Sequence, residues 1–190
     1  MKFHVLLLTG LIGLLFTAPA YAGCWAPLQQ DGSIRFSISQ AGAPLNGTFG
    51  AYDGLICITP GDDKADRIEV RITMASVDTR LPELDTALRG ADFFDVARWP
   101  QGLFKSESVR ALGGNRYEVR GQLTLRDVTR DITVPFTFTP DAGQGAQLEG
   151  KLVIQRLDYH IGLGQWSDTR WVGNQVDITF SVSLRAITQH

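Results

Sequence analysis

Apolar residues recur at every second position in segment after segment of this 190-residue chain. Ile34, Phe36 and Ile38, for example, alternate with polar residues. A period of two indicates strands with one buried face, whereas a helix needs a period near 3.6. The chain is therefore predicted to be all-β. The pattern predicts eight strands, around residues 34–38, 49–58, 68–74, 104–109, 117–125, 132–138, 148–154 and 176–184.

The segments between these runs are rich in residues that favour turns. Gly42, Pro44 and Asn46-Gly47 lie between the first two runs, and Gly113-Gly114-Asn115 lies between the fourth and fifth. Short turns of this kind join antiparallel neighbours. An eight-stranded antiparallel sheet that closes into a barrel has no exposed edges and leaves room for one slender ligand. The alternative architecture is a sandwich of two sheets.

One stretch breaks the alternation between the third and fourth predicted strands. Leu81, Leu84 and Leu88 lie close to helical spacing, and Trp99-Pro100 ends the stretch. We predict one or two short helices over residues 80–96. An excursion of this length would form a lid or side wall of a barrel mouth, or alternatively a plug packed on the sheet.

The N-terminus has the order of a secretory signal peptide. Lys2 precedes an apolar run over residues 5–16, and Ala20 and Ala22 bracket a cleavage point before Gly23. The run is too short to span a bilayer as a helix. We predict a signal peptide over residues 1–22, a single domain over residues 23–190 and export to the periplasm. Lipid attachment at Cys24 is the alternative, disfavoured by Tyr21, where a lipoprotein site prefers an aliphatic residue.

Cys24 and Cys57 are the two cysteines of the chain. An exported protein folds where thiols can oxidise, so we predict a disulfide between them. The alternative is a buried free thiol at Cys57. Two thiols alone do not make a structural zinc site.

Composition argues against several classes of function. The net charge of −2 gives no basic surface for nucleic acid. Beyond the predicted signal peptide only His160 and His190 remain, which leaves no base for a Ser-His-Asp triad and no histidine-rich metal site. No glycine-rich phosphate loop precedes a helix. We therefore expect a binding protein and not an enzyme, with no metal and no cofactor.

Residues 88–100, followed by Phe104-Lys105-Ser106, resemble the signature of the YceI-like family of periplasmic proteins. The resemblance extends from about Trp25 to Leu184. Two places depart from the family pattern: Asp127 stands where Gly is usual, and Tyr159-His160 stands where Phe-Gly is usual. Further segments that agree are 76–79, 121–130, 156–158, 162–166 and 172–173.

The resemblance implies a lipocalin-like barrel that holds a long isoprenoid, such as a polyprenyl phosphate or the tail of a quinone, for transport, storage or sensing. Some YceI-like proteins are encoded beside membrane cytochromes of the b561 type. The alternative function is therefore an accessory protein of such a cytochrome, with a solid core and no stored ligand. Arg126 and Arg130, which flank a predicted turn, are candidate contacts for an anionic headgroup.

The predicted ligand-binding residues are apolar side chains that lie on the inward phase of the strands, in the excursion, or in the family segments. Phenylalanine is frequent among them, and the alternative is that these rings simply fill the barrel. The set is Phe36, Ile38, Phe49, Val70, Ile72, Met74, Leu88, Phe93, Phe94, Trp99, Phe104, Leu123, Phe136, Phe138 and Trp166.

Overall fold

The computed structural model describes residues 23–59, 66–141 and 145–187. The predicted signal peptide, residues 1–22, lies outside them. Strands dominate, and one α-helix and three short 3-10 helices occur in the described part. The elements in chain order are β1 (Gly23–Gln40), β2 (Ala43–Phe49), β3 (Tyr52–Ile58), β4 (Arg67–Thr73), η1 (Met74–Ser76), β5 (Val77–Asp78), α1 (Pro82–Arg89), β6 (Gln101–Gly113), β7 (Arg116–Leu125), β8 (Val128–Pro140), β9 (Gly145–Gln155), η2 (Arg156–Tyr159), η3 (Gly164–Trp166) and β10 (Val172–Ile187).

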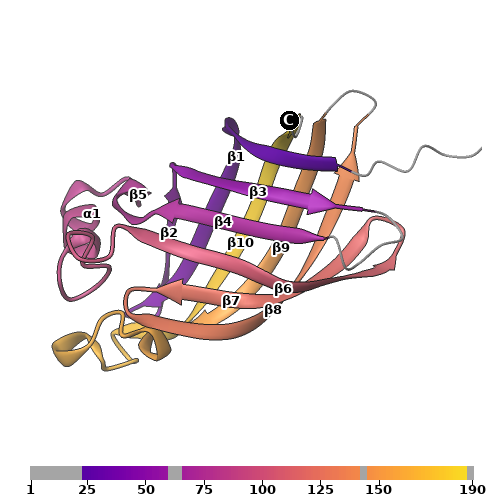
Figure 1. Ribbon diagram of the computed structural model, residues 1–190. Coiled ribbons are helices and arrows are strands. Elements are labelled where there is room, and N and C mark those ends of the chain that lie inside the picture. The colour runs from indigo at the N-terminus through magenta and orange to yellow at the C-terminus, as the bar shows by residue number, and fades with distance from the viewer. Residues whose placement is uncertain (1–22, 60–65, 142–144, 188–190) are drawn as a thin grey trace, which may run out of the picture.

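The strands form one antiparallel sheet that closes on itself (Figure 1). β10 pairs with β9 on one side and with β1 on the other, so the sheet closes into a barrel. The barrel strands are β1, β3, β4, β6, β7, β8, β9 and β10, which confirms the predicted eight-stranded barrel and excludes the sandwich. The predicted second strand is divided at Gly50 and Ala51 into β2 and β3, which both pair with the long β1.

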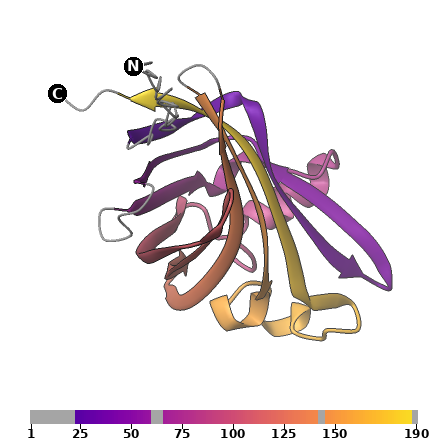
Figure 2. The same cartoon turned by 90° about the vertical axis from the view of Figure 1, so that its right-hand side faces the viewer.

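The turn between β1 and β2 is tighter than the sequence predicted. Gln40 pairs with Ala43, so Ala41 and Gly42 alone make the connection. Their φ angles are 49° and 82°, as a two-residue hairpin turn of type I′ requires. Residues 43–47, expected in the turn, instead belong to β2, and the hairpin projects beyond the rest of the barrel (Figure 2).

Two longer connections lie at one end of the barrel (Figure 1). The first runs from η1 through β5 and α1 to β6, and confirms the predicted helix between the third and fourth strands of the barrel. The second is the segment 156–171, which joins β9 to β10. Gly162 N donates to the carbonyl of Asp92, 2.8 Å away, so the two connections contact each other. No helix of the described ranges is long and apolar enough to cross a membrane.

The opposite end of the barrel is closed by covalent and apolar contacts. Cys24 and Cys57 form the predicted disulfide, which joins β1 to β3. Next to it, the Trp25 and Phe138 rings lie 4.9 Å apart in an edge-on arrangement, and Tyr117 stacks on Phe136 at 5.4 Å. Edge-on and offset ring pairs are favourable geometries, so this aromatic group makes a solid floor.

Candidate functional site: an apolar cavity inside the barrel

A cavity of about 280 Å³ runs through the interior of the barrel above this floor. Nearly all of its wall is apolar, and residues from every barrel strand contribute to it. The lining residues that carry polar groups are Gln40, Arg156, Tyr52 and Trp166. The volume is close to the lower end of the range of roughly 300 to 1,000 Å³ typical of ligand pockets.

The period-two pattern builds this cavity because it points one face of each strand inward. Burial of the inward side chains changes along the strand. On β8, Ile132 is half-buried near the turn with β7, whereas Val134, Phe136 and Phe138 are buried toward the floor. Phe104 and Leu152 also line the cavity yet remain half-buried. Inward apolar side chains that retain exposed surface border empty space, so the centre of the barrel is hollow.

Glycines let aromatic rings lie against the wall of the cavity. Phe36 pairs with Gly47, and Phe180 pairs with Gly150. In both pairs the ring occupies the place that a glycine Cβ would take. Each ring therefore covers the neighbouring strand, and the space along the axis stays open.

The mouth of the cavity lies at the end that carries the two long connections. Gln40, on the β1–β2 hairpin, and Ala87, on α1, line the cavity and are exposed to solvent. Leu84, Trp166 and Val172 complete this part of the wall. The opening is thus framed by the hairpin, by α1 and by the segment 156–171.

Arg156 holds the segment 156–171 in place from inside the wall. Its side chain is 2% exposed, and its five N–H groups donate to five backbone carbonyls. The distances from guanidinium nitrogen to oxygen lie between 2.6 and 2.8 Å. Burial lowers the pKa of Arg156. Because every donor is used, the residue shapes the mouth and has no N–H left for a ligand. The acceptors are Ile161, Gly162, Trp166, Val172 and Gly173.

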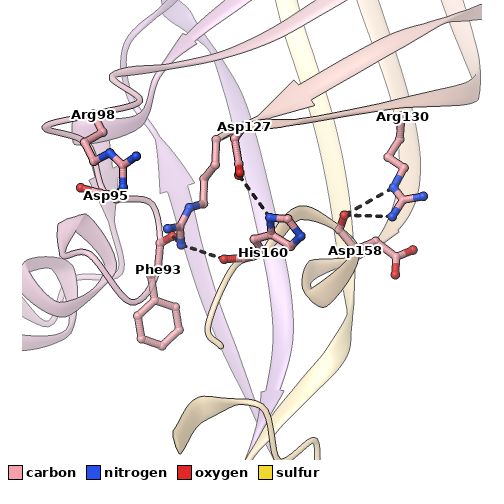
Figure 3. Close-up of polar contacts among 8 residues, drawn as sticks. Phe93, Asp95, Arg98, Asp127, Arg130, Asp158 and His160 are labelled. Carbon is pink, nitrogen blue, oxygen red and sulfur yellow. Dashed lines mark hydrogen bonds and ion pairs between the residues drawn. The ribbon is translucent and has the colours of Figure 1, made fainter. Parts of the chain in front are cut away.

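Arg126 and Arg130, the two candidate contacts for an anionic headgroup, form hydrogen bonds with backbone carbonyls instead (Figure 3). Arg126 Nη1 donates to the carbonyls of Phe93 and His160 at 2.6 and 2.7 Å. Its guanidinium lies 4.8 Å from the centre of the Trp99 ring. Arg130 donates to the carbonyl of Asp158. Neither arginine lines the cavity. Both instead tie the β7–β8 turn to the connections around the mouth.

The two places that depart from the family pattern contact each other. His160 Nδ1 lies 3.2 Å from Asp127 Oδ1 (Figure 3). The pKa of Asp127 is lowered mainly by a hydrogen bond from its own backbone. The hydrogen bond with His160 lowers it further. Left-handed backbone angles occur at His160, with φ of 57°, and at Arg126, with φ of 53°, but not at Asp127. The family glycine corresponds to Asp127, but the residue of this turn with the left-handed backbone is Arg126, one position earlier.

Thirteen of the fifteen predicted ligand-binding residues lie together in the cavity wall. The other two do not. Phe138 belongs to the solid floor, and Trp99 lies outside the cavity, with the guanidinium groups of Arg98 and Arg126 close to its ring. Contact with a ligand stays a prediction for the whole set. Those in the wall are Phe36, Ile38, Phe49, Val70, Ile72, Met74, Leu88, Phe93, Phe94, Phe104, Leu123, Phe136 and Trp166.

The sequence set omitted several residues of the wall. Ile178, Phe180 and Val182 follow the alternation of β10, so their inward phase was readable from the sequence. Tyr52 and Arg156 gave no such signal, because neither polarity nor spacing indicates that they face a cavity.

Proteins similar to this chain are known from both sequence and structure. The model of the YceI-like domain matches residues 25–184. Protein YceI of Escherichia coli O157:H7 is 32% identical over 180 residues, which cover 89% of this chain and 91% of that protein. The crystal structure of Burkholderia cenocepacia BcnA superposes with a TM-score of 0.78 at 27% identity, over 83% of this chain and 98% of that chain.

A more distant structure has the same fold. It is a polyisoprenoid binding domain from Saccharophagus degradans, implicated in plant cell wall breakdown. It superposes with a TM-score of 0.71 at 15% identity, over 87% of this chain and 99% of that chain.

Proposed function

The chain belongs to the YceI-like family, and on this premise we propose that it binds the chain of an isoprenoid lipid in the cavity of its barrel. The observation that carries the proposal is the hollow, apolar interior with a mouth at one end. The shared fold with a polyisoprenoid binding domain supports the same class of ligand. A polyprenyl phosphate and an isoprenoid quinone both have chains of this kind.

The energetics favour a partly inserted hydrocarbon chain. Burial of each methylene contributes about 0.8 kcal/mol, so one five-carbon isoprene unit contributes roughly 3 to 4 kcal/mol before ordering costs. Two or three buried units are then enough for stable binding. The cavity is small, so the ligand is a slender chain and not a bulky ring system.

Transport, storage or sensing in the periplasm follows from this binding, with no reaction at the site. The disulfide and the predicted signal peptide support an exported protein. His160, the one histidine within the described ranges, contacts Asp127 at the rim and does not line the cavity. The alternative, a solid accessory to a membrane b-type cytochrome, is less well supported because the interior is hollow.

Mass spectrometry of an organic extract of the secreted protein tests the proposal. We expect about one isoprenoid molecule per protein. Leu152→Trp fills the cavity from β9, so this variant should lose the lipid. The matched control is Val153→Trp, on the outer face of the same strand, where the side chain is 54% exposed. A wild-type extract without isoprenoid, or equal lipid in both variants, contradicts the proposal.

A further inference from the structure

Trp171 is an unusually exposed aromatic residue beside the cavity mouth. Its side chain is 64% exposed, the highest value among the large apolar residues of the described ranges. The Trp171 carbonyl accepts a hydrogen bond from Ala41 N at 2.8 Å, and the Trp171 N–H donates to the carbonyl of Asp168 at 3.1 Å. Trp171 is therefore fixed next to the tip of the β1–β2 hairpin.

The hairpin tip carries no charge. Residues 39–47 contain no acidic or basic side chain, and residues 39–44 are all exposed. The charged residues nearest to Trp171 in sequence are Arg170 and Asp168, which form an ion pair with each other. Trp171 and residues 39–47, which we call the mouth patch, thus form a neutral and partly apolar surface.

The mouth patch is continuous with the cavity. Gln40 and Leu45 belong to the patch and also line the cavity, and Val172, which follows Trp171, lines it too. Gln40 pairs with Val172 across the β1–β10 ladder. A lipid that enters or leaves between the hairpin and β10 therefore passes the patch.

We propose that the mouth patch inserts into the interfacial region of a lipid bilayer and joins the cavity to the membrane. The inference rests on the proposed function, because an isoprenoid chain that crosses water exposes its methylene groups, and each exposed methylene is unfavourable. Tryptophan is enriched at membrane interfaces, where one end of the ring is apolar and the other is wet. Since the patch is neutral, this contact requires no anionic lipid.

Flotation of the secreted protein with phosphatidylcholine vesicles tests this surface. We expect the wild-type protein to float with the vesicles at low and at high salt. Trp171→Ser should lower vesicle binding roughly tenfold, because the large exposed apolar side chain of the patch is removed. Trp171→Phe should restore much of it. The matched control is Leu112→Ser, a 40% exposed leucine near the β6–β7 turn at the opposite end of the barrel (Figure 1).

The inference is overturned by no flotation of the wild-type protein, by equal flotation of Trp171→Ser, or by binding that needs anionic lipid and disappears at high salt. Binding only to vesicles that contain membrane proteins also overturns it and indicates a protein partner. Lipid extraction separates the two proposals. A protein that floats but contains no isoprenoid refutes the proposed function, whereas a lipid-loaded protein that never floats refutes the membrane contact alone.

Discussion

Arg156 shows how much one side chain decides at the residue scale. Five carbonyls converge on one guanidinium, so the loop that frames the mouth depends on a planar group with five donors. Lysine keeps the charge but has three donors from a single nitrogen, and does not reproduce this geometry. The site therefore needs arginine for its shape as well as its charge.

Arg156→Lys is expected to destabilise the protein by about 3 kcal/mol or more, because two or more buried carbonyls lose their donors at roughly 1 to 3 kcal/mol each. Urea denaturation monitored by circular dichroism measures the change. Arg170→Lys is the control, since the Arg170 side chain is highly exposed and pairs only with Asp168. Equal stability of the two variants would show that the five bonds are not important for folding.

The glycines that face aromatic rings act at the scale of the element. At Gly47 a Cβ would meet the ring of Phe36 and, at 3.1 Å, the methyl group of Thr79. The Phe36 ring can therefore lie against β2 only because residue 47 has no side chain.

Gly47→Ala should displace the Phe36 ring into the cavity, cost about 1 to 3 kcal/mol by overpacking, and reduce the lipid recovered from the protein. Gly50→Ala, just beyond the end of β2, is the control, because the nearest atom to its Cβ is 4.0 Å away. Thermal unfolding and lipid extraction measure both effects. Undiminished lipid in Gly47→Ala would mean that the ring moves elsewhere.

The whole molecule combines a solid floor with a hollow centre, and the two parts should respond differently to truncation. Phe138, 2% exposed, packs against Trp25 and Tyr117 in the floor. Phe104 borders the cavity and is half-buried. A ligand that binds only the folded state stabilises it in proportion to its affinity, so contacts made by the ligand appear only in the loaded protein.

Phe138→Ala should cost about 3 to 5 kcal/mol in delipidated and loaded protein alike. Phe104→Ala should cost less than this in the delipidated protein, and more in the loaded protein, where a lipid contact is also lost. Denaturation of both forms of each variant measures the difference. A cost for Phe104→Ala that does not change with lipid would indicate that no ligand contacts this wall.

The sequence by itself predicted the alternating strands, the helix between the third and fourth barrel strands, and, each with an alternative left open, the antiparallel barrel and the pairing of Cys24 with Cys57. The strands and the helix follow from local periodicity and turn residues, whereas the closure of the barrel depends on the distant pairing of β1 with β10. Most of the cavity wall was also readable, because alternation assigns each strand residue to one of two faces.

Tertiary structure alone decided which inward side chains surround empty space and which fill it. Phe138 and Phe104 both point inward, yet only Phe104 borders the cavity, because the rings of Trp25 and Tyr117 pack against Phe138. It also decided the roles of Arg126 and Arg156. A sequence shows that an arginine is charged, but the carbonyls that occupy its donors come from residues that only the closed barrel brings together.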